Sequence, residues 1–199
     1  MAITFQYNKT SLQNLEKQLK IRVRALPTIK NKESALRTEV KRAKDDLNHL
    51  TEKLGSSMKA YDQMIALWGE FDTTLLKVED VKMNIKKIAG VRVPLFDKVE
   101  FSVKPFSLFS SPVWISDGIA LLKTLAEMAI EQEFMTQKLE LLEKARKKTT
   151  QKVNLFEKVQ IPGYDDAIRK IKRFMEDEEN LSKSAQKIVK SRQASEATK

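Results

Sequence analysis

Apolar residues recur along the first part of the chain at alternating intervals of three and four residues. From Leu12 to Ile85 this spacing defines 22 positions, of which 18 are apolar; the exceptions are Arg22, Glu33, Ser57 and Lys82. A repeat that averages 3.5 residues places one apolar seam along one side of a helix, and this seam must be buried against another helix. A helix of that extent would be about 110 Å long, far longer than a compact domain of this mass needs.

Three places along this predicted helix depart from a uniform seam. Pro27 lacks an amide donor and predicts a kink near residues 23–27. A break is not favoured there, because the heptad register continues across the proline. Gly55-Ser56-Ser57 is a second weak point, after which the seam carries the bulkier side chains of Tyr61, Met64, Trp68 and Phe71. Lys86, Lys87 and the following Gly90 are typical of a helix end.

The period changes in the middle of the chain. Val99, Phe101 and Val103 alternate with polar residues, as in a β-strand. Pro94, Pro105 and Pro112 limit any sheet here to short or edge strands. We therefore expect a small β-hairpin or a loop with strand-like edges at about residues 90–115.

A second helical pattern begins near Ser116-Asp117 and continues to about residue 192, with an interruption at Ile161-Pro162-Gly163. The two helices have similar lengths and flank the hairpin, so the chain is expected to turn back on itself, with residue 15 facing about residue 190. In that pairing Pro27 and Pro162 do not face each other. The predicted fold is all-α: a long antiparallel two-helix coiled coil with a small β-hairpin or loop at mid-chain.

The composition excludes several kinds of active site. The chain has no Cys and a single His, so it cannot build a His/Cys metal site or a nucleophile–histidine pair of the usual kind. Its five Gly residues match no phosphate-binding motif. Glu176-Asp177-Glu178-Glu179 point around the whole helix and are best interpreted as a solvated acidic turn. We expect no catalytic residue, no metal and no cofactor.

The charge indicates what the surface meets. The formal net charge is +10, which suits an acidic protein, an anionic lipid surface or nucleic acid equally well. Cations gather at Lys41, Arg42 and Lys44, from Lys144 to Lys152, and at Arg169, Lys170, Lys172 and Arg173. Each cluster is more simply a solvated helix face, but contact with acidic surfaces along the rod stays open. No apolar run approaches the ~18 residues that cross a bilayer, and we expect a cytoplasmic location.

Three segments carry a family resemblance. Lys152–Pro162, followed by Ala167-Ile168-Arg169-Lys170-Ile171, resembles the "RVNALE…IP…IRYI" signature of the D subunit of the rotary V-type/A-type ATPases. Gly90, Val91, Arg92, Val93 and Pro94 are similar to the segment that leads into the central hairpin of that family. The opening from Asn8 to Leu12, with Leu15 and Leu19, is similar to the start of those proteins.

This resemblance implies a rotor shaft that is not itself an enzyme. Residues 1–57 and 150–199 would stand inside a ring of A and B subunits, and residues 58–149 would form the lower stalk, peripheral to the membrane. Rotation would couple ATP hydrolysis or synthesis to ion translocation. The implied partners are the A and B subunits, the F subunit and the connector to the membrane rotor, with no nucleic acid and no membrane insertion.

Candidate contact residues follow from this mapping. The candidates for contact with the ring are Lys152, Val153, Asn154, Glu157, Ile161, Pro162, Arg169, Lys170, Lys172 and Arg173. The basic residues among them are expected to meet acidic loops that line the ring. Those expected to meet the F subunit are Tyr61, Met64, Trp68 and Phe71, together with facing residues near 130–145. A membrane-surface coiled coil that binds anionic lipid, or a nucleic-acid-associated coiled coil, is the alternative.

Overall fold

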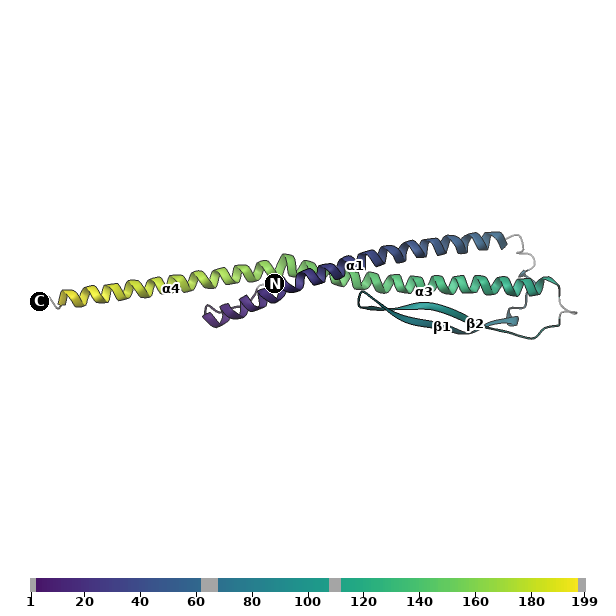
Figure 1. Cartoon of the computed structure of the whole chain (residues 1–199), viewed down its shortest axis with the longest axis horizontal. Helices are drawn as coiled ribbons and strands as arrows, with labels where there is room; N and C mark the ends of the chain where they lie inside the picture. Colours follow the sequence, from purple (N-terminus) through teal and green to yellow (C-terminus); the bar gives the residue numbers. More distant parts are fainter. Residues whose placement is uncertain (1–2, 62–67, 108–111, 197–199) are drawn as a thin grey trace. The chain divides into compact units, whose positions relative to one another are not determined.

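The structure, a computed structural model, describes residues 3–61, 68–107 and 112–196. Its elements in chain order are helix α1 (Lys9–Tyr61), the 3-10 turn η2 (Thr73–Leu75), strands β1 (Leu76–Ile88) and β2 (Val91–Val103), helix α3 (Trp114–Asn154), the π-helical segment η3 (Leu155–Gln160) and helix α4 (Ile161–Glu196) (Figure 1). The predicted fold class, long antiparallel helices with a small mid-chain hairpin, is confirmed.

The chain forms two compact units that share its long helices. Unit 1 consists of Met1–Asn31 and Thr149–Lys199, and unit 2 of Lys32–Lys148. The C-terminal boundary of unit 2 thus lies next to the expected border at residue 150, whereas the N-terminal boundary lies well before residue 57. The division into compact units does not test which residues enter a ring. The assignment of residues 1–57 and 150–199 to the ring therefore stays a prediction.

In unit 1, α1 begins directly after its capping residue, Asn8. The Oδ1 atom of Asn8 accepts a 2.7 Å hydrogen bond from the backbone N–H of Ser11, which satisfies one of the free amides of the first turn. Of the two expected caps, Asn8 and Thr10, the structure uses Asn8. The helix then continues through Pro27 without a break, as the unbroken heptad register predicted.

The core of unit 1 joins the start of α1 to the first half of α4. It consists of Leu15, Ala167, Ile168 and Ile171, flanked by half-buried apolar side chains. The lead-in before α1 also packs here: a Cβ atom on Gly163 would lie 3.1 Å from Cδ1 of Ile3. A larger residue at position 163 would therefore require the Ile3 side chain to move. Gly163 does not break the helix, because α4 includes it.

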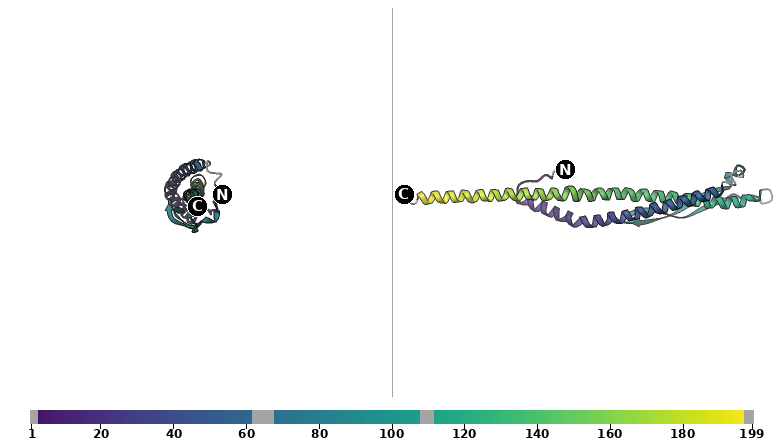
Figure 2. Two further views of the ribbon diagram at one scale, coloured as in Figure 1. Left: turned by 90° about the vertical axis from the view of Figure 1, so that its right-hand side faces the viewer. Right: turned by 90° about the horizontal axis from the view of Figure 1, so that it is seen from above.

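In unit 2 the hairpin packs against both α1 and α3. Val93 of β2 is fully buried together with Leu36, Val40 and Ala43 of α1 and Leu142 of α3. The rings of Phe96 and Phe134 extend this contact along α3, and the views in Figure 1 and Figure 2 show the two strands following that helix. The buried residues of the hairpin belong to β2, so β1 is its outer, more exposed strand.

The hairpin begins earlier than the sequence predicted. Residues 76–88, expected to end the first helix, form β1, and the hairpin spans 76–103 instead of about 90–115. Ala89 and Gly90 form the two-residue turn between the paired residues Ile88 and Val91, with φ of 47° and 83°. Positive φ at both positions is the geometry of a type I′ turn, which Gly adopts without strain. Gly90 thus turns a hairpin and does not end a helix.

The return helix lies in a different register from the one predicted. Leu15 packs against Ala167, Ile168 and Ile171, so it does not face residue 190. The prediction was wrong because it extended the first helix to residue 85, whereas α1 ends at Tyr61 and the return begins at Trp114. Because α1 is shorter than predicted, its residues contact residues of the return helix that lie earlier in the sequence than expected.

Candidate functional site: contact surfaces on the two units

Polar side chains connect the two helices of unit 1 at three levels. The Nε atom of Arg22 donates a 2.7 Å hydrogen bond to Oε1 of Gln160. Lys30 Nζ lies 2.7 Å from Glu157 Oε1, and Lys172 Nζ lies 3.0 Å from Glu16 Oε1. Exposed ion pairs add little stability. All three contacts, however, are broken by a slide of one helix along the other, so together they specify the register.

The π-helical segment η3 lies opposite the part of α1 that contains Pro27. Pro27 lies between Arg22 and Lys30, whose partners Gln160 and Glu157 belong to η3. In this segment the N–H of Ile161 bonds to the carbonyl of Phe156, five residues back, just before Pro162, which has no N–H to donate. Pro162 itself lies between Gln160 and Tyr164, which both contact Arg22, so the expectation that Pro27 and Pro162 do not face each other stays a prediction.

The candidate ring-contact residues fall into two groups. Glu157 and Lys172 bind the opposite helix, and Val153 and Ile161 are half-buried. The remaining candidates are exposed on the surface of unit 1: Lys152, Asn154, Pro162, Arg169, Lys170 and Arg173. Arg169 is paired with Asp166 on its own helix, whereas Lys170 and Arg173 make no ion pair within the described part of the chain.

The second half of α4 is exposed on all sides, a feature that the predicted pairing did not anticipate. From Glu176 to Ala194 every side chain is exposed, including the apolar Leu181, Ile188 and Val189. Glu176–Glu179 form an acidic turn, and the cations beyond it are Lys183, Lys187, Lys190 and Arg192. Within the residues that the structure describes, the core of unit 1 ends at Met175. Leu181, Ala185 and Ile188 therefore form a seam that no helix of the described residues covers.

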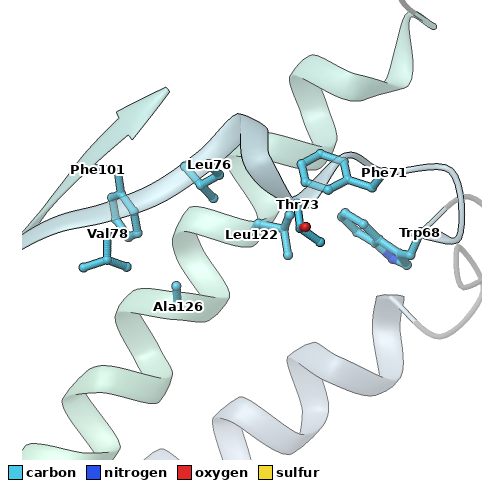
Figure 3. Close-up of a pocket in the computed structure, with 8 residues that line it drawn as sticks. All are labelled: Trp68, Phe71, Thr73, Leu76, Val78, Phe101, Leu122 and Ala126. Atoms are coloured by element: carbon cyan, nitrogen blue, oxygen red, sulfur yellow. The ribbon is translucent and has the colours of Figure 1, made fainter. Parts of the chain in front are cut away.

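In unit 2, aromatic rings gather where β1 and η2 approach the first turns of α3. The ring centroids of Trp68 and Phe71 lie 5.7 Å apart, and both rings contact Trp114. Beside them a cavity of about 460 Å³ opens between the strands and α3, lined by Trp68, Phe71, Thr73, Leu76, Val78, Phe101, Leu122 and Ala126 (Figure 3). Its lining is almost entirely apolar, which suits apolar side chains better than a polar ligand.

The structure brings together two of the residues expected to meet the F subunit. Trp68 and Phe71 line the same cavity, whereas Tyr61 is half-buried at the end of α1. Met64 lies outside the described residues. The facing region near 130–145 belongs to α3, where Phe134 and Leu142 already contact the hairpin.

The pairing of Arg22 with Gln160 was not among the predicted contacts, although one signal for it was present. Arg22 is a polar exception in the apolar seam, and a polar residue at a seam position commonly specifies register. Its partner could not be identified, because the predicted pairing placed a different part of the return helix opposite it. The guanidinium of Arg22 also lies 4.5 Å from the ring centroid of Tyr164, a cation–π contact that no spacing rule would reveal.

The described residues offer little other chemistry. Among them no three His, Cys, Asp or Glu side chains converge as metal ligands would. His49, exposed on α1, has no such neighbours. None of the helices, within the described part of the chain, combines the length and apolar character that crossing a membrane requires.

Comparison with known proteins bears on what these surfaces do. The sequence matches the family profile of the ATP synthase D subunit over residues 11–191. It is 29% identical over 186 residues to the V-type ATP synthase D subunit of Borreliella burgdorferi, covering 92% of each chain. It is also 29% identical over 198 residues to the protein of the same name from Chlamydia muridarum, covering 96% of each chain. The family resemblance inferred from the sequence is confirmed: the chain belongs to the family of the ATP synthase D subunit, the central-stalk component of a rotary ATPase.

Proposed function

We propose that the chain is the rotating shaft of its ATPase and has no catalytic role of its own. It would pass torque between a ring of A and B subunits, which bind ATP, and the membrane rotor that translocates ions. A shaft needs two helices that cannot slide along each other. The contacts of Arg22, Lys30 and Lys172 with the opposite helix supply that property in unit 1.

We further propose that residues 1–57 and 150–199 stand inside the ring. The observation that carries this proposal is the exposure of α4 from Glu176 to Ala194, where the apolar Leu181, Ile188 and Val189 lie among basic side chains. Exposed apolar residues on a helix indicate a surface that another protein covers. Cations beside them suit acidic loops, and such contacts stay reversible because they are screened by salt.

Residues 58–149 would form the lower stalk, which binds the F subunit and the connector to the membrane rotor. The rings of Trp68 and Phe71 beside an apolar cavity support a protein contact in this region, since aromatic residues dominate binding energy at interfaces. Tyr61, Met64 and the α3 residues near 130–145 remain further candidates for the same contact.

A complex purified through a tagged copy of the chain tests the partners. Recovery of the two large nucleotide-binding subunits supports the proposal, and their absence rejects it. Within that complex, replacing Lys170 and Arg173 by Gln should weaken ring assembly or reduce ATP-driven rotation, because these exposed cations are free to meet acidic loops. Replacing Lys59 and Lys77 by Gln makes the matched control, because both are exposed and belong to residues 58–149, outside the proposed ring contact. Unchanged rotation in the Lys170/Arg173 variant would contradict the proposed ring contact.

A further inference from the structure

The half of the hairpin nearest its turn carries cations and no acidic residue. We define this half as the hairpin tip, Lys82–Pro94; its cations are Lys82, Lys86, Lys87 and Arg92. Lys82 is paired with Glu100, whereas the other three make no ion pair within the described part of the chain. All four side chains are exposed. At Lys86, Lys87 and Arg92 the tip therefore presents positive charge that no ion pair among the described residues neutralises.

Another cation lies beside the turn itself. Lys32 of α1 reaches toward Gly90, where an added Cβ atom would lie 3.3 Å from its Nζ. The ammonium group is thus held next to a turn that already has cations on both strands. Like charges placed close together raise the local potential and favour an anionic partner.

Exposed apolar side chains lie among these cations. Met83 is 58% exposed and Ile85 is 69% exposed, although Val93 in the same hairpin is fully buried. Met83 and Ile85 are two residues apart on β1 and so share one face of the strand. The hairpin has already buried its inner side against α1 and α3. The outer strand β1 therefore exposes the apolar side chains of Met83 and Ile85, with the cations of the tip around them.

The backbone of β1 offers a place for a further strand. In the described part of the chain β1 pairs with β2 alone, so its other edge has no strand partner. The two register shifts in this hairpin, between Val78 and Asp80 and between Lys82 and Met83, lie before the regular part of the tip. From Met83 to Ile88 the register is regular up to the turn. A regular exposed edge can accept a strand from another chain.

We propose that the hairpin tip is a docking surface for an extended acidic segment of a partner protein, which adds as a strand along the free edge of β1. Acidic side chains of that segment meet Lys86, Lys87 and Arg92, and its apolar side chains cover Met83 and Ile85. A lipid surface fits less well, because it offers no regular row of backbone N–H and C=O groups to pair with the strand edge. This surface is separate from the proposed ring contacts of unit 1 and does not depend on them.

The first test uses the full-length chain and synthetic peptides of alternating Glu and Val, with alternating Lys and Val as the control. Binding of the acidic peptide should slow hydrogen exchange at alternate backbone amides from Met83 to Lys87, and the Lys peptide should not. Replacing Lys86, Lys87 and Arg92 by Glu should weaken binding by about tenfold or more. The matched control places the same charge change on exposed α1 residues, with Lys41, Lys44 and Lys53 replaced by Glu. Equal loss in both variants overturns a specific tip site.

A second test separates strand addition from simple charge attraction. Acidic peptides N-methylated on every odd or on every even residue each lose the hydrogen-bonding groups of one edge. Strand addition requires that one of the two series loses binding while the other keeps it. If both bind like the parent peptide, or if vesicles of anionic phospholipid protect the same amides while the peptides do not, the proposal is wrong.

Discussion

Arg22 and Gln160, 138 positions apart in the chain, are joined by a 2.7 Å hydrogen bond between Nε and Oε1. The same guanidinium lies over the ring of Tyr164, 4.5 Å from its centroid. Arg22 occupies a position of the apolar seam, so a single polar residue connects the seam to the π-helical turn of the opposite helix. That connection fixes which turn of the return helix lies beside Pro27.

Replacing Arg22 by Met should therefore lower the free energy of unfolding. The variant loses the hydrogen bond to Gln160, the cation–π contact with Tyr164 and two exposed hydrogen bonds to Gln18 on its own helix. The part-buried hydrogen bond and the cation–π contact are together worth about 1–2 kcal/mol. Urea unfolding of the full chain measures the change. Arg24→Met is the control, since Arg24 is exposed and makes no ion pair in the part of the chain that the structure describes. Equal effects of the two substitutions would contradict a specific role for Arg22.

Replacing Pro27 by Ala should stabilise the isolated chain. The new N–H can donate to the carbonyl four residues back, and Ala removes the ring clash, so the gain is up to about 3 kcal/mol. Thermal unfolding followed by circular dichroism measures the change. Thr28→Ala, at the next exposed position, should shift stability by no more than about 0.5 kcal/mol. A fall in stability for Pro27→Ala would mean that the helix pair requires the irregular turn.

Strand β1 shows why part of this fold could not be predicted from the sequence. Val78, Lys82 and Ile85 continue the three–four spacing of the seam, so the pattern indicated helix. The two register shifts in the hairpin interrupt the period-two alternation that would have indicated a strand. In addition, Met83 and Ile85 are exposed, so the strand lacks the usual contrast between a buried and an exposed face. The signal that was present is the Ala89-Gly90 turn between β-branched residues.

The paired helices were predictable because their apolar residues must be buried. Leu15, Leu36, Val40 and Ala43 all belong to the seam, and all are buried in the structure. Their partners were not predictable, because a heptad seam packs equally well after a slide of whole turns. Contacts such as Lys30 with Glu157 remove that ambiguity, but exposed charges are too numerous along this chain to be matched by sequence alone.

Leu142 and its neighbour Leu141 provide a direct measure of the unit 2 core. Leu142 is fully buried between α1 and β2, whereas Leu141 is 40% exposed. Leu142→Ala should cost about 2–5 kcal/mol, because it leaves a cavity that the helices and the hairpin cannot close. Leu141→Ala should cost much less, with the same change in helix propensity. Urea unfolding of both variants measures the two losses in the free energy of unfolding. Equal losses would contradict the packing of the hairpin on this part of α3.

Asp72, which caps η2 just before the hairpin, should make the stability of unit 2 depend on pH. Its carboxylate accepts a 2.8 Å hydrogen bond from the N–H of Thr74, which lowers the pKa of Asp72, with a smaller contribution from the charge of Lys104. Because the pKa is lowered on folding, the stabilisation is complete above the unfolded pKa. It is lost as the pH falls from about 4 through the folded pKa.

The variant Asp72→Asn keeps a side-chain acceptor but cannot titrate. The difference in thermal midpoint between the native chain and this variant should shrink as the pH is lowered from 7 to 3. A carboxyl titration followed by NMR should give a pKa for Asp72 below its ordinary value. A constant difference in midpoint over this pH range would show that the capping carboxylate does not contribute to folding.

Leu181 and Ile188 distinguish a contact surface from a structural core. Both are exposed, at 71% and 55%, on the part of α4 that extends beyond the core of unit 1. Replacing both by Ser should change the free energy of unfolding of the isolated chain by no more than roughly 0.5 kcal/mol, as is usual for surface substitutions. In the assembled ATPase the same variant should weaken the hold of the ring on the shaft, seen as lower torque in single-molecule rotation. Gln186→Ser is the control on the same stretch. If the double variant rotates with native torque, this half of α4 does not carry the ring contact.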